Sequence, residues 1–134
     1  MVHALNNARR ALTRNGLLVD IHPTPDPRRI FCAASEGQRS VGILRGSRER
    51  YRTADAKLTT VVRQGLFRLL HTEVFHFMHY AASLRLLRAY VPGEFKHMWM
   101  DGATERRIVR LLGPRGVGTI SIDEPVRISV FKKT

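Results

Sequence analysis

The sequence has little cysteine, few aromatic side chains and no long apolar run. Cys32 is the one cysteine among 134 residues, so no disulfide can form within the chain and no cysteine pair can build a zinc ribbon or a redox motif. Apolar runs are far shorter than the roughly 20 residues of a membrane-spanning helix. Arg9, Arg10 and Arg14 interrupt the region where a signal peptide needs an apolar core. We therefore expect a cytoplasmic protein with no membrane segment.

Basic residues dominate the charge. The chain has 23 Lys and Arg against 11 Asp and Glu, a net charge of +12, while 43% of its residues are hydrophobic. This length and composition predict one folded domain over residues 1–134. The charge suits a small basic interaction module that binds nucleic acid or an acidic protein. No aromatic residues interleave with the arginines to form a platform for stacked bases, so a solvated basic surface is favoured over a nucleic-acid interface.

Apolar residues recur at helical spacing in four segments. We expect helices over His3–Arg14, Thr53–Phe67, Ser83–Val91 and Asp101–Leu112. Thr53, Ser83 and Asp101 are the expected N-caps. The first helix should end near Asn15, and Pro92 should end the third.

Leu17–Ile21 has apolar residues on both faces rather than on alternate positions, which is typical of a buried parallel strand. The three prolines of His22–Pro27 predict a rigid loop. The remaining expected strands are Ile30–Ala33 and Ser40–Leu44, joined as a hairpin, Arg68–Ala81 with both faces at least half covered, and Val117–Phe131, which Pro125 should interrupt.

The segment Ala4-Leu5-x-x-Ala8-Arg9-Arg10-Ala11-Leu12-x-x-x-Gly16-Leu17-Leu18-Val19-Asp20 resembles class I S-adenosylmethionine-dependent methyltransferases. In that family a helix of this kind leads into the fifth strand. The resemblance implies an α/β fold, an incomplete Rossmann-like sheet ordered five, seven, six with helices on its faces, in which residues 27–52 form a small hairpin insertion. Thr13-Arg14-Asn15-Gly16 stands where the family has a proline and paired glycines.

The resemblance covers only the C-terminal, substrate-side half of the family's fold. The family binds S-adenosylmethionine with a glycine-rich loop after the first strand and an acidic residue at the end of the second. Gly113–Gly118 does not supply that loop, because it precedes a strand and opens no helix. We therefore expect this chain to bind no cofactor alone and to be inactive alone. The sequence leaves open whether Met1 is the start of the protein.

The same resemblance leaves the strand Leu17–Ile21 without the neighbour that the family places beside it. An unpaired apolar strand edge invites pairing with another chain. The expected partner is either a second copy, giving a homodimer, or a complementary N-terminal half.

Asp20, His22 and Pro23 are the candidate substrate-side residues. They end a strand, and ligands of open α/β sheets lie at the carboxyl ends of strands. The alternative is a histidine that only caps the strand end. No catalytic residue is identifiable from the sequence.

Other reactive side chains have structural explanations. His71, His76 and His79 are not expected to bind a metal, because His76 should point away from the other two and no acidic residue or cysteine completes a ligand set. Cys32 is expected in the core rather than as a nucleophile.

Overall fold

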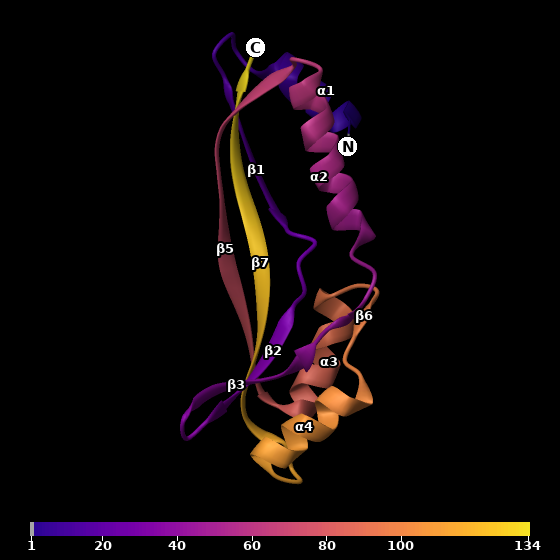
Figure 1. The fold of residues 1–134 in the computed structure, drawn as a ribbon. Coiled ribbons are helices and arrows are strands. Elements are labelled where there is room, and N and C mark those ends of the chain that lie inside the picture. Colours follow the sequence, from indigo (N-terminus) through magenta and orange to yellow (C-terminus); the bar gives the residue numbers. More distant parts are fainter. Residues whose placement is uncertain (1) are drawn as a thin grey trace. The chain divides into compact units, whose positions relative to one another are not determined.

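The computed structural model describes residues 2–134, which form a mixed α/β structure with four helices and seven strands (Figure 1). This part of the chain divides into two compact units. Unit 1 comprises residues 2–25, 48–75 and 125–134, and unit 2 comprises residues 26–47 and 76–124. Strands β5 (Phe67–Ser83) and β7 (Val117–Lys133) contribute to both units.

In unit 1 strand β7 pairs with two others. Strand β1 (Leu17–Pro23) is antiparallel to β7, with Leu17 opposite Lys132 and Pro23 opposite Val126, and β5 also pairs with β7. Strand β7 therefore has both β1 and β5 as pairing partners. The sheet is mostly antiparallel.

Helices α1 (Val2–Ala11) and α2 (Glu49–Arg63) pack on one face of this sheet. Their amphipathic faces supply part of a core made of Leu5, Leu58, Val61, Phe67 and Phe131. Because side chains alternate along a strand, Leu18 packs against this core while Leu17, Val19 and Ile21 point to the opposite face. Leu17 and Val19 are each 53% exposed, and Ile21 is 59% exposed.

The prediction of a buried parallel strand over Leu17–Ile21 is therefore wrong. The strand is antiparallel to β7, and its outward apolar side chains are exposed. The coverage predicted for Arg68–Ala81 is wrong as well, because most of β5 is exposed. Apolar residues on both faces of a strand show that both faces are apolar. They do not show that other parts of the same chain cover both faces.

Unit 2 contains the predicted hairpin. Strands β2 (Arg29–Ala34) and β3 (Gly37–Ile43) are antiparallel, and β2 also pairs with β7. Two short strands, β4 (Arg45–Gly46) and β6 (Met98–Trp99), pair with each other. Helices α3 (Leu84–Glu94) and α4 (Gly102–Leu112) complete the unit.

The core of unit 2 includes Cys32, which is fully buried, as predicted. Burial raises the pKa of its thiol, which opposes a role as a nucleophile. Gly42 has a positive φ and allows the close approach of α4, since a Cβ there would lie 2.1 Å from Thr104 Oγ1.

The helix limits differ from the predicted ones at several points. Helix α2 begins at Glu49, and Arg48 rather than Thr53 occupies the N-cap position, without a side-chain hydrogen bond. Helix α1 ends at Ala11, and α3 continues through Pro92. His22 and Pro23 belong to β1 and not to a loop.

Two predicted N-caps are confirmed. The side chain of Ser83 accepts a hydrogen bond from Leu86 N, and that of Asp101 accepts one from Thr104 N. No helix among residues 2–134 is long and apolar enough to span a membrane.

Asp101 gives the fold a pH-dependent contribution. Its carboxylate accepts hydrogen bonds from Thr104 N at 2.8 Å and from Arg45 Nε at 3.0 Å. These bonds, with the one from Thr104 first, lower the pKa of Asp101 to about 2. In the unfolded chain the pKa of an aspartate carboxyl is about 4. The ionised Asp101 carboxylate therefore stabilises the fold above that pH, and this contribution is lost as the pH falls to about 2.

We expect the Asp101→Asn variant to be less stable than the parent at pH 7 and the difference to shrink below about pH 4. Urea unfolding of both proteins between pH 7 and pH 2 measures this difference. Glu36→Gln, at an exposed carboxylate that pairs with Arg39, is the control and should show a smaller change. A difference for Asp101→Asn that stays constant over the whole range would contradict the prediction.

Candidate functional site

A chain of charged side chains joined by hydrogen bonds links β1, α2 and β7 in unit 1. His22 lies at its centre, with Nδ1 2.5 Å from Asp20 Oδ2 and Nε2 2.7 Å from Asp55 Oδ1. Arg127 Nη1 donates to the same Asp55 oxygen at 2.8 Å. We call Asp20, His22, Asp55 and Arg127 the polar cluster.

The strand register explains how the polar cluster assembles. His22 lies opposite Arg127 in the pairing of β1 with β7, so the two side chains share the sheet face that α2 covers. The side chain of His22 is only 12% exposed. Both ring nitrogens of His22 therefore lie within hydrogen-bonding distance of a carboxylate, and Arg127 adds a positive charge beside Asp55 where water has little access.

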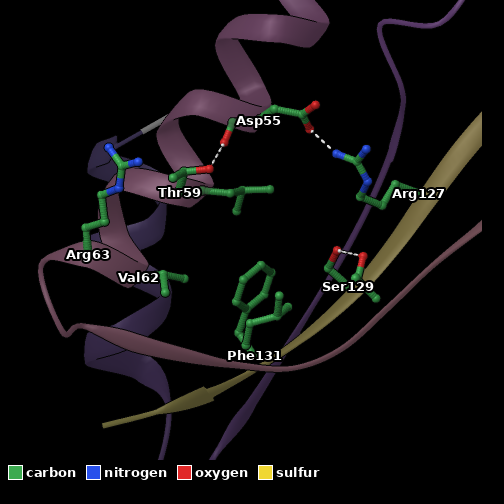
Figure 2. Close-up of a pocket in the computed structure, with 10 residues that line it drawn as sticks. Asp55, Thr59, Val62, Arg63, Arg127, Ser129 and Phe131 are labelled. Atoms are coloured by element: carbon green, nitrogen blue, oxygen red, sulfur yellow. Dashed lines mark hydrogen bonds and ion pairs between the residues drawn. The ribbon is translucent and has the colours of Figure 1, made fainter.

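A cavity of about 550 Å³ lies beside the polar cluster, between α2 and the strands (Figure 2). Its lining comes from one face of α2 and from β5 and β7. The lining residues are Asp55, Leu58, Thr59, Val62, Arg63, Leu69, Thr72, Arg127, Ser129 and Phe131. Asp55 and Arg127 therefore belong both to the cluster and to the cavity wall.

The structure brings two of the three predicted site residues together. Asp20 and His22 are joined by a hydrogen bond, whereas Pro23 is the next strand residue and pairs with Val126. None of the three is among the residues that line the cavity. Their assignment to a substrate stays a prediction.

Sequence reasoning missed Asp55 and Arg127. A signal was present, because Asp55 shares a helix face with Leu58 and Val62, and Arg127 shares a strand face with Phe131. A charged residue in line with core positions marks either a buried ion pair or a site.

His79 is the centre of a second group, in unit 2. Its Nδ1 lies 2.7 Å from the Tyr90 hydroxyl and its Nε2 lies 2.9 Å from Glu124 Oε2. The residue is 7% exposed, and its ring contacts Phe95 edge-on. Burial, with Glu94 and Glu124 nearby, raises the pKa of Tyr90, so the phenol is not activated as a nucleophile. This group has the features of a satisfied core histidine.

The three histidines of β5 each have an acidic neighbour: His71 pairs with Glu73, His76 with Asp123 and His79 with Glu124. Each histidine has a different partner. Within residues 2–134, no group of three His, Cys, Asp or Glu side chains is arranged to hold a metal ion.

No known protein family, curated protein or solved structure matches the chain. What unit 1 does is therefore inferred from its geometry and from the sequence pattern.

The bridging role of His22 predicts its effect on stability. Replacement by Leu removes both hydrogen bonds and leaves Asp20 and Asp55 as like charges with fewer donors, so we expect a loss of about 1–3 kcal/mol in the free energy of unfolding. Urea unfolding measures it. His71→Leu is the matched control, because that side chain is 62% exposed and pairs with Glu73 at 3.5 Å. Its effect should stay within about 0.5 kcal/mol. If both variants lose the same free energy of unfolding, the hydrogen bonds of His22 add no more stability than the exposed pair of His71, and the prediction is wrong.

Proposed function

We propose that this chain is the C-terminal, substrate-side half of a fold like that of class I S-adenosylmethionine-dependent methyltransferases, and that it acts when a complementary N-terminal half pairs with β1. The strand arrangement of unit 1 supports this proposal. Strand β7 pairs with both β1 and β5, and α2 connects β1 to β5 along the chain. This is the order five, seven, six that the sequence resemblance implies.

The observation that carries the proposal is the uncovered side of β1. The strand is at the end of its sheet, so one of its edges is unpaired among the described residues. On the face away from α1 and α2, Leu17, Val19 and Ile21 are each more than half exposed. A free strand edge beside an exposed apolar face is typical of an interface that another polypeptide covers.

The charge of unit 1 indicates the chemistry of that partner. Among residues 2–25, 48–75 and 125–134, twelve Lys and Arg stand against four Asp and Glu, a net charge of +8. A second copy would bring the same charge to the interface, and like charges across an interface are repulsive. This favours an acidic complementary half over a homodimer.

S-adenosylmethionine would belong to the complementary half. Within residues 2–134, no loop with two or more glycines leads from a strand into a helix, so these residues do not fit the cofactor. In the assembled fold this chain would offer Asp20, His22 and Pro23 at the carboxyl end of β1, where open α/β sheets bind ligands.

The test begins with the DNA that flanks the coding sequence. We expect it to encode an acidic segment in which a strand leads through a glycine-rich loop into a helix. Expressed with this chain, that segment should form a 1:1 complex in size-exclusion chromatography with light scattering. S-adenosylmethionine should bind the complex, and not this chain alone, in calorimetry.

Matched variants locate the interface. Val19→Glu should abolish the complex, because it places a charge on the apolar face beside the free edge. Leu86→Glu, at a side chain of unit 2 that is 49% exposed, should leave it intact. The proposal fails if no such segment is encoded, or if Val19→Glu has no effect. Binding to duplex DNA that moderate salt removes, without S-adenosylmethionine, would instead identify a basic interaction module.

A further inference from the structure

The cavity beside α2 is separate from the surface that the proposed function uses. The exposed residues Leu17, Val19 and Ile21 point away from α2, whereas the cavity lies on the face that α2 covers. We propose that this cavity binds a small carboxylic acid, with the apolar body of the acid on the cavity wall and its carboxylate on Arg127. This inference does not rest on the proposed function.

The size and the apolar part of the wall fit such a ligand. A volume of about 550 Å³ is within the usual range of small-molecule sites. Leu58, Val62, Leu69 and Phe131 supply the apolar surface, with one residue or more from each of α2, β5 and β7. Leu69 is 44% exposed, so an apolar ligand that covered it would remove apolar surface from water.

The hydroxyl groups of the wall are already engaged. Thr59 Oγ1 donates to Asp55 O at 2.9 Å, and the Thr72 and Ser129 hydroxyls bond to each other at 3.0 Å (Figure 2). The body of the ligand can therefore be apolar. The charged side chains of the wall are then the main determinants of the charge of the ligand.

Arg127 is oriented to receive an anion. One of its five N–H donors bonds to Asp55, which fixes the guanidinium beside the cavity, and its side chain is 32% exposed. A planar guanidinium presents further donors in a fork that matches a carboxylate.

The balance of charge selects a monoanion. Two basic residues, Arg63 and Arg127, and one acidic residue, Asp55, are among the residues that line the cavity. The net positive charge disfavours a cationic ligand, and the Asp55 carboxylate disfavours a dianion such as a phosphate monoester. A neutral apolar molecule would make no use of Arg127.

Titration of the ¹⁵N-labelled chain with octanoate, octanol and octylamine, followed by NMR, tests the proposal. Octanoate should shift the amide signals of residues 55–63 and 127–131 with a Kd of about 1 mM or lower. Octanol and octylamine should bind roughly tenfold more weakly or not at all, because octanol brings no negative charge to Arg127 and octylamine brings a positive one.

Variants separate this site from any other apolar surface. Arg127→Gln should weaken octanoate roughly tenfold and leave octanol unchanged. Thr59→Trp should block octanoate by filling the cavity from an exposed helix position. The hydrogen bond that it removes goes to the backbone oxygen of Asp55 and not to the Asp55 carboxylate. Val117→Ser, at a side chain of unit 2 that is 63% exposed, is the control and should leave binding unchanged.

The proposal is overturned if octanoate and octanol bind equally, if Thr59→Trp still binds octanoate as the parent does, or if the shifted signals lie in residues 17–21 alone. Because the experiment uses this chain by itself, its failure would leave the complementary-half proposal untouched, and the reverse also holds.

Discussion

Strand β7 is the element on which the rest of the structure depends, because β1, β2 and β5 all pair with it. Its residues 126–132 pair with β1, and its residues 120–123 pair with β2. Pro125 stands between these two stretches and has no N–H to donate, while its carbonyl accepts a hydrogen bond from Thr24 N. A proline costs no ladder hydrogen bond at a point where the partner strand changes. The border between the two units falls at this residue.

In strand β1 several polar side chains point to the covered face and several apolar ones point to the exposed face. Asp20 and His22 point to the face that α2 covers, and Leu17, Val19 and Ile21 point outward. An antiparallel sheet with one solvated face normally places its apolar side chains inside and its polar ones outside. The polar side chains remain inside because Asp55 and Arg127 satisfy them, since a buried polar group without a partner is costly. Their placement leaves Leu17, Val19 and Ile21 on the side that this chain does not cover.

The sequence predicted those features of the fold that depend on neighbouring residues, namely helix caps and a hairpin turn. Ser83 and Asp101 were identifiable as N-caps, and the hairpin of β2 and β3 was identifiable from its turn. Burial was not predictable, because periodicity shows which faces are apolar and not which of them the same chain covers. For the candidate site, strand-end reasoning found Asp20 and His22. Asp55 and Arg127 lie 33 and 105 positions beyond His22 in the sequence, and only the pairing of β1 with β7 and the packing of α2 bring them together.

The ion pairs of unit 1 engage its acidic side chains, and the excess of Lys and Arg remains. Asp20 and Asp55 lie in the polar cluster, where His22 and Arg127 contact them. Glu49 and Glu73 pair with Arg52 and His71. All four carboxylates of the unit thus face basic groups of the same unit, so the field outside it is dominated by the remaining Lys and Arg side chains. Such a field attracts acidic surfaces and slows association between two copies, whereas the apolar side chains of β1 supply the contact area. In the proposed complex, charge would therefore select the kind of partner, and the uncovered strand would fix where it binds.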